Sequence, residues 1–152
     1  MMARILIIDD DAEMRVLARQ ILKSSKHEIV LAADGKEGMK KFRADPADLV
    51  IINLYKPDQE GLETIIELRR FFPEVGIMAM SSRAASRTML AVAQALGATE
   101  ILQKPFFAKE MLTAVERALL SNDYLCKRKA SSGMSFDRLT ALGASGLFAK
   151  YG

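Results

Sequence analysis

Short apolar runs alternate with amphipathic segments along the first 120 residues. The runs contain no polar alternation, which is typical of parallel strands that are buried on both faces. They lie at residues 5–8, 29–32, 49–52, 77–80 and, more briefly, 101–102. Between the runs, apolar residues recur at the spacing of a helix face. The pattern predicts five β-α units in strict alternation, and therefore an open parallel sheet with helices on both faces.

Polar residues stand out where the predicted strands end. They are Asp9, Asp10 and Asp11 after the first strand, Asn53 after the third, Ser81 after the fourth and Lys104 after the fifth. In an open parallel sheet, ligands bind outside the carboxyl ends of the strands. We therefore expect these side chains to share one site. Taken singly, each has a plainer interpretation, because aspartate and serine are common helix N-caps and lysine is usually a solvated surface charge.

Composition is that of a soluble globular chain with one domain. Half of the 152 residues are hydrophobic and 27% are charged. No apolar run approaches the ~20 residues of a membrane helix, so we expect no membrane association. The N-terminus enters the first strand without a secretory segment, and the single Cys126 forms no internal disulfide. We therefore expect a cytoplasmic protein.

The net charge of +3 comes from the C-terminal end of the chain. Residues 121–152 contain five basic and two acidic side chains, so residues 1–120 are neutral. A neutral body gives no argument for nucleic-acid binding. We expect a domain at residues 1–120 and an extension at 121–152 that is partly flexible or docks on a partner. His27, the one histidine, is expected at the surface with no metal role.

The polar positions and their neighbours resemble a bacterial response-regulator receiver domain, of the single-domain, chemotaxis-regulator-like kind. The similarity covers about residues 3–120 and depends on the segments 5–11 and 48–61, on Ser81 and on Lys104-Pro105-Phe106. It implies the flavodoxin-like (βα)5 fold, a doubly wound parallel sheet with strand order 2-1-3-4-5. It also implies a role in a two-component phosphorelay as a signalling module and not as an enzyme.

The resemblance assigns a metal site and a phosphoacceptor position. The Mg2+ site falls on Asp9, Asp10, Asn53 and the backbone carbonyl of Tyr55, and Asn53 is also the acceptor position. Asp10 is the better candidate for direct contact with Mg2+, with Asp9 acting through water. The acceptor, an aspartate in this family, takes a phosphoryl group from a kinase histidine.

Further positions complete the implied switch. Ser81 supplies the hydroxyl and Lys104 a positive charge for the phosphoryl oxygens, and the bond from Lys104 to Pro105 is expected to be cis. The family also has an aromatic switch residue on the fifth strand. By the resemblance this position falls on Ile101, which is not aromatic.

Asn53 changes the expected chemistry. The amide oxygen has no full negative charge, so Asn53 is predicted not to be phosphorylated, and Mg2+ is predicted to bind more weakly. The substitution also lowers repulsion among the remaining carboxylates, so the metal-free fold should gain stability. The sequence does not distinguish a native Asn53 from a substituted one.

Several functions stay open. The first is a receiver that normally works by phosphorylation-controlled protein binding, and the second is a pseudo-receiver that binds partners without phosphorylation. A flavodoxin-like small-molecule-binding protein is a further alternative, and a DNA-binding regulator is disfavoured by the neutral body. The expected partner is a histidine kinase or phosphotransfer protein, on the face around Asp9 and Asn53. Self-association or target binding is expected on the face of the fourth helix, predicted from Ser86 to Leu96, and the fifth strand and helix.

Overall fold

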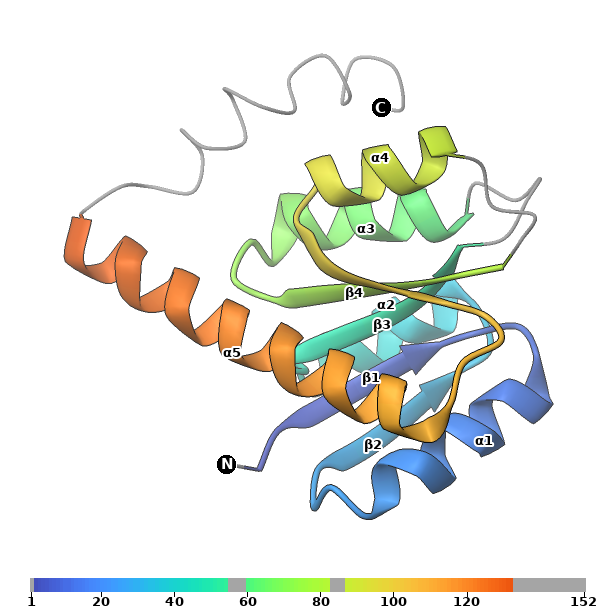
Figure 1. Cartoon of the computed structure of the whole chain (residues 1–152). Helices are drawn as coiled ribbons and strands as arrows, with labels where there is room; N and C mark the ends of the chain where they lie inside the picture. Colours follow the sequence, from blue (N-terminus) through green and yellow to red (C-terminus); the bar gives the residue numbers. More distant parts are fainter. Residues whose placement is uncertain (1, 55–59, 83–86, 133–152) are drawn as a thin grey trace.

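The computed structural model of the chain describes residues 2–54, 60–82 and 87–132, and the side chains up to residue 122. Strands and helices alternate throughout, as the hydrophobic pattern predicts (Figure 1). The elements are β1 (Arg4–Ile8), α1 (Ala12–Lys23), β2 (Glu28–Ala32), α2 (Gly35–Ala44), β3 (Leu49–Leu54), α3 (Glu60–Phe71), β4 (Gly76–Ser81), α4 (Arg87–Ala95), β5 (Ala98–Gln103) and α5 (Ala108–Ser132).

The five strands form one parallel sheet in the order β2-β1-β3-β4-β5. This confirms the predicted flavodoxin-like fold and its strand order. The central strand β3 pairs with β1 on one side and β4 on the other, and the chain reverses its direction of winding at β1. Because parallel strands all end at the same edge, the register brings the ends of β1, β3, β4 and β5 together.

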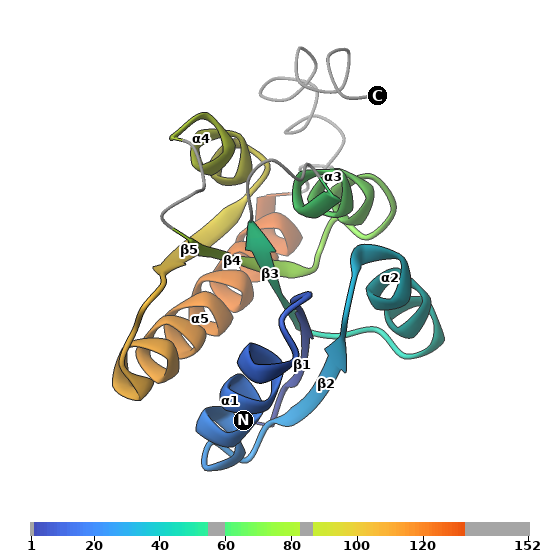
Figure 2. The ribbon, with the colours of Figure 1, turned by 90° about the vertical axis from the view of Figure 1, so that its right-hand side faces the viewer.

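Helices cover both faces of the sheet (Figure 2). Helices α1 and α5 pack on one face, and α2, α3 and α4 pack on the other. The side chains of β1 and β3 point alternately into these two cores, so Ile5 and Ile7 join one cluster while Leu6 and Ile8 join the other. Burial on both sides explains why the strand sequences are apolar without alternation.

Some element bounds differ from the prediction. Strand β5 begins directly after Gly97, three residues before the predicted start, because it pairs with β4 over most of its length. Gly97 has φ +98, a left-handed conformation suited to the reversal after α4. Asp34 is the N-cap of α2, and its side chain accepts a hydrogen bond from the Glu37 N–H. Helix α4 is described from Arg87, and Ser86 lies outside the described residues.

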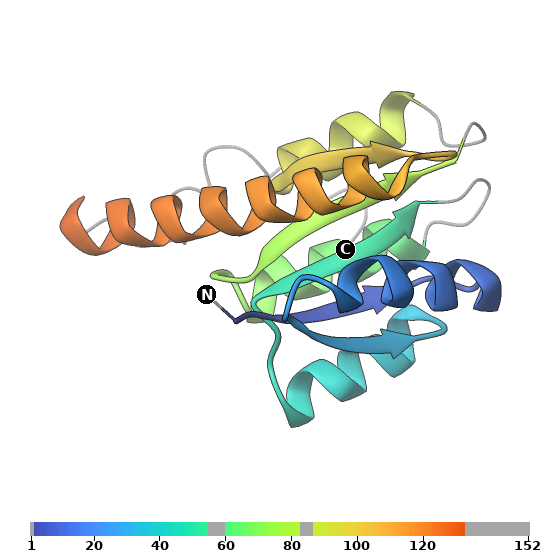
Figure 3. The same cartoon turned by 60° about the horizontal axis from the view of Figure 1, so that its bottom comes forward.

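Helix α5 continues well past the sheet (Figures 1 and 3). It has 25 residues and ends at Ser132, so the predicted domain boundary after residue 120 lies inside one continuous helix. The boundary itself, and a docking role for the extension, stay predictions.

The prediction of a surface position for His27 is wrong. Its side chain is only 3% exposed. The Nδ1 atom accepts a hydrogen bond from the Ala3 N–H at 2.9 Å, so the tautomer places the proton on Nε2, which lies 3.0 Å from Oε1 of Glu116 on α5. The imidazole thus connects the edge of the sheet to the last helix. His27 and Glu116 are 89 residues apart in the sequence, so local sequence patterns cannot predict their contact.

Candidate functional site

Four of the predicted site residues lie at the carboxyl edge of the sheet. Asp9 follows β1 directly, Asn53 lies near the end of β3, and Ser81 is the last residue of β4. Strand pairing sets Leu54 opposite Ser81 and Ser81 opposite Gln103. The Lys104 N–H then donates to the Ser81 carbonyl at 2.8 Å. The register alone therefore brings the ends of four strands to one place (Figure 2).

Asp9 and Lys104 form a shielded ion pair. The Lys104 ammonium donates to Oδ2 of Asp9 at 2.9 Å, and the Asp9 side chain is fully buried while that of Lys104 is 17% exposed. The second carboxylate oxygen, Oδ1, accepts from the Asp11 N–H at 3.0 Å. Burial raises the pKa of the Asp9 carboxyl above its ordinary value, while these two donors act in the opposite direction.

Asp9, Asp10 and Asn53 line a small hollow at this edge, with a volume of about 40 Å³. Within the described residues, the Oδ1 atom of Asn53 is buried and has no hydrogen-bond partner. A buried acceptor without a partner is costly, and such atoms commonly mark a water or ion site. The hollow is large enough for one water-sized species. The part of the hollow that the described residues line is far smaller than the several hundred Å³ of a cofactor pocket.

Pattern reasoning missed residues that close one side of the hollow. The Oε1 atom of Glu60 accepts from the Gly35 N–H at 2.8 Å, and the Thr64 hydroxyl donates to the Glu60 carbonyl at 2.9 Å. A Cβ atom on Gly35 would lie 2.1 Å from the Thr64 hydroxyl oxygen, so glycine is required for this close approach. Asp34 also lines the hollow. In the sequence, the local signs of these residues are an acidic residue at the start of a helix, Glu60, and the Asp34-Gly35 pair.

The other predicted residues are placed differently. Ser81 is buried, 3% exposed, and neither it nor Lys104 is among the residues that line the hollow. The Lys104–Pro105 peptide bond is cis. Asp11 is the N-cap of α1 and accepts from the Glu13 N–H, so its side chain serves the helix. Tyr55 lies outside the described residues, and its predicted carbonyl ligand stays a prediction.

The donor set suits Mg2+ in type but is small in number. Asp10 is exposed beside the buried Asn53 oxygen, and these hard oxygen atoms are of the kind that Mg2+ prefers. Asp9 is already engaged by Lys104. Within the described part of the chain, no three His, Cys, Asp or Glu side chains gather in a way that could hold a metal ion. Mg2+ needs only one or two carboxylates and retains several waters, so a small set of oxygen donors of this kind is compatible with the ion.

Comparison with known proteins identifies the family. The model of the response regulator receiver domain matches residues 5–116. The chain is 32% identical to the chemotaxis protein CheY of Listeria monocytogenes over 118 residues, which are 77% of this chain and 98% of CheY. It is also 32% identical to the DNA-binding transcriptional regulator NtrC of Azospirillum brasilense over 94% of this chain. It spans only 30% of that regulator's length.

Solved structures agree with the sequence relatives. A CheY-like receiver domain protein from Methanospirillum hungatei superposes with a TM-score of 0.74 at 25% identity, covering 82% of this chain and 98% of that one. NtrX from Brucella abortus, solved with ADP, gives 0.75 at 27% identity, covering 86% of this chain and 29% of NtrX. In the described residues, no helix is both long and apolar enough to cross a membrane. From its fold, its matched residues and these relatives, the chain belongs to the response regulator receiver domain family.

Proposed function

We propose that this chain is a cytoplasmic receiver module that docks on a histidine kinase or phosphotransfer protein and binds its targets without being phosphorylated. Receiver domains are in general signalling modules of two-component systems and not enzymes, they interact with such kinases and phosphotransfer proteins, and they bind Mg2+ at an acidic pocket. The proposal places Asn53 in the acceptor position of that pocket.

One observation supports this proposal above the others. The Asn53 Oδ1 atom is buried without a hydrogen-bond partner in the described structure, beside Asp9 and Asp10. A carboxylate at the same position would have a negative oxygen facing the hollow. The amide has no such charge and no nucleophilic oxygen anion, so attack on a phosphoryl group should be negligible. Lys104 pairs with Asp9, so this cation already has an anionic partner.

Exposed apolar side chains beside the site support docking of a protein partner. Val16 and Leu17 on α1 are 55% and 43% exposed, and Phe107, three residues after Lys104, is 80% exposed. Val16 and Leu17 line one shallow hollow on α1, and this helix packs beside α5 (Figure 2). Neighbouring exposed apolar residues of this kind indicate a protein-binding surface.

The acceptor assignment is tested by Asn53→Asp. Acetyl phosphate with Mg2+ should label this variant with a base-labile, hydroxylamine-sensitive acyl phosphate, and should leave the wild type unlabelled. Asn122→Asp, which adds the same charge at the opposite end of the sheet, is the matched control and should stay unlabelled. A folded Asn53→Asp protein that takes no label would overturn the acceptor assignment.

A double variant, Leu17→Asp together with Asn53→Asp, separates docking of the phosphohistidine protein from the phosphorylation reaction itself. This change should slow phosphoryl transfer from a phosphohistidine protein while labelling by acetyl phosphate stays unchanged, because the small donor needs no docking surface. Arg19→Gln, on an exposed residue of the same helix, lowers the net charge by the same one unit and serves as the control. If Leu17→Asp slows both donors equally, the surface of α1 has no special role in docking.

A further inference from the structure

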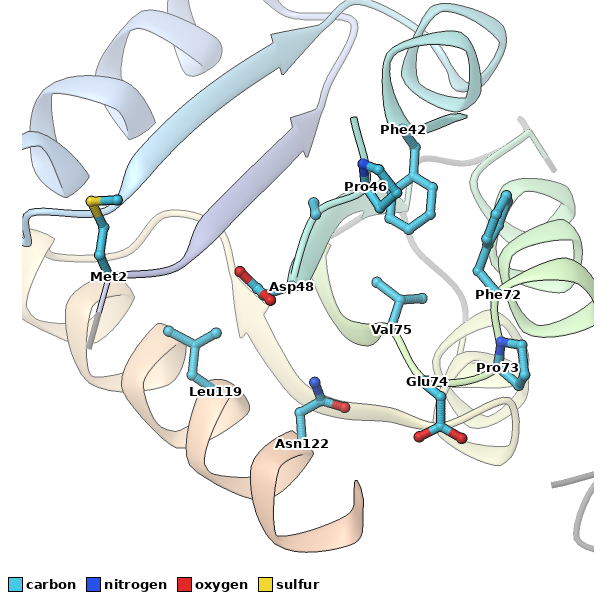
Figure 4. Close-up of a pocket in the computed structure, with 11 residues that line it drawn as sticks. Met2, Phe42, Pro46, Asp48, Phe72, Pro73, Glu74, Val75, Leu119 and Asn122 are labelled. Atoms are coloured by element: carbon cyan, nitrogen blue, oxygen red, sulfur yellow. The ribbon is translucent and has the colours of Figure 1, made fainter. Parts of the chain in front are cut away.

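A second and larger hollow lies at the amino ends of the strands, opposite the candidate site (Figure 4). Its volume is about 590 Å³. It is lined by residues that closely precede β1, β3 and β4, by the C-terminal ends of α2 and α3, and by α5. The receiver function proposed above makes no use of this hollow.

The floor of this hollow is apolar. Phe42 of α2 and Phe72 after α3 meet edge to face, with ring centroids 4.7 Å apart, and Val75 lies beside them. Pro46 and Pro73 stand near the rings. A cavity of this size accepts two or three large apolar side chains.

The rim of the hollow is acidic. The exposed carboxylates of Asp48 and Glu74 stand at its edge, and its lining within the described residues includes no lysine or arginine. An apolar floor with an acidic rim suits a segment that combines apolar side chains with basic ones. The shape and charge of the hollow thus specify the chemistry of its occupant.

Helix α5 connects this hollow to the end of the chain. Leu119 and Asn122 of α5 line the hollow, and the helix continues ten residues further to Ser132. At 1.5 Å per residue, the helix end lies about 15 Å beyond Asn122. Twenty more residues follow, and in extended form the seven residues to Leu139 can span about 23 Å and the ten to Leu142 about 33 Å. The chain length therefore allows Leu139 and Leu142 to return to the hollow, whereas the four residues to Phe136 span only about 13 Å.

The composition of that last segment matches the hollow. Phe136, Leu139 and Leu142 recur at intervals of three, and Arg138 lies among them. Gly133 follows the end of α5 directly, and glycine permits the chain to reverse there. A tether of this length also gives an effective concentration on the order of 1 mM, so even weak contacts suffice for binding in the same molecule.

We propose that residues 138–142 bind in this hollow of their own chain, with Leu139 and Leu142 on the floor and Arg138 at the acidic rim. The segment would cover the Phe42–Phe72 pair and hold the C-terminus against the end of the sheet that is remote from Asn53. Because the two sites are at opposite ends of the strands, the proposal is independent of the receiver function.

Hydrogen exchange of the full-length protein tests this proposal. Leu139→Asp should raise the exchange rate of amides in residues 42–48 and 72–76 about tenfold, the effect of losing one well-buried leucine. Arg138→Glu should produce the same change, because it reverses the charge that the segment brings to the acidic rim. Ser145→Asp adds the same charge outside the segment and should leave these amides unchanged. The fold is intact in every case if exchange in β1 and β3 stays slow.

The outcomes separate the candidate occupants. Protection that is the same at 5 µM and at 500 µM protein supports binding within one chain, whereas protection that grows with concentration assigns the hollow to a second copy and overturns the proposal. Exchange in residues 42–48 and 72–76 that is unchanged by Leu139→Asp also overturns it. As a direct check, a peptide of residues 133–152 should restore slow exchange to the Leu139→Asp protein, and the same peptide with the Leu139→Asp change should not.

Discussion

Arg69 of α3 is a buried cation whose removal should cost much of the stability of the fold. The residue is 8% exposed. Its guanidinium donates to the carbonyl oxygen of Leu96 at 2.7 Å, and to those of Gly97 at 3.2 Å, Val75 and Pro73. These carbonyls belong to the loop before β4 and to the turn between α4 and β5. One side chain therefore joins three segments of the chain.

Arg69→Met retains the apolar stem and removes every donor. Each buried carbonyl left without a partner costs about 1–3 kcal/mol, although some recover a bond to water. We expect a total loss of about 3–5 kcal/mol, which is a large part of the roughly 5–15 kcal/mol typical of a domain. For a chain of this length, the melting temperature should fall by roughly 10–15 °C.

Urea unfolding followed by circular dichroism measures this loss directly. Arg70→Met is the matched control, because Arg70 is exposed and stacks on Phe71 with its guanidinium carbon 5.4 Å from the ring centre. That change should cost less than about 0.5–1 kcal/mol. Arg69→Lys should fall between the two, because an ammonium group cannot reach several carbonyls at once. A loss below about 1 kcal/mol for Arg69→Met would refute the reasoning.

Three further predictions concern the site and the assembly. Because burial raises the pKa of the Asp9 carboxyl, the folded protein binds this proton more tightly than the unfolded chain, so the wild type loses stability as pH rises above the ordinary value of 3.8. The stability of Asp9→Asn relative to wild type should therefore grow with pH in urea titrations from about pH 4 upward, and a flat difference would contradict this. Asn53→Asp should lower the melting temperature without metal and regain it in millimolar Mg2+, since the added carboxylate repels Asp10 and attracts the ion; a melting temperature indifferent to Mg2+ would count against the metal site. Self-association through α4, β5 and α5 predicts that Thr99→Arg, on the exposed edge strand β5, lowers the dimer fraction in sedimentation velocity. A wild type that is monomeric at all concentrations would exclude that interface.

The fold was predictable because its signals are local and repeated. Residues such as Ile5 to Ile8 are buried on both sides, and an unbroken apolar run of that length is typical of a central strand in a parallel sheet. The end of α2 also has a local signal, since its C-cap Asp45 precedes Pro46 and the residue before proline avoids the helical conformation. The start of β5 was missed, since its first residues gain their strand geometry by pairing with β4.

The location of the candidate site also followed from sequence, because parallel strands deliver their carboxyl ends to one edge. Asp9, Asn53, Ser81 and Lys104 could be chosen from the chain on that rule alone. The contacts that each of these side chains makes at the site could not be predicted from the sequence. Whether Lys104 pairs with Asp9, or whether Ser81 faces the hollow, depends on distances set by packing between strands.

The amino-acid order by itself determined the alternation of elements, the parallel sheet and the edge at which polar groups collect, because burial periodicity and strand polarity are properties of neighbours along the chain. Tertiary structure alone decided the contacts between residues far apart: the bond from Gly35 to Glu60, the burial of His27 against Ala3 and Glu116, and the four carbonyls around Arg69. Such contacts need no local pattern, since each polar group requires only one partner at the right distance, and folding can supply that partner from any part of the sequence.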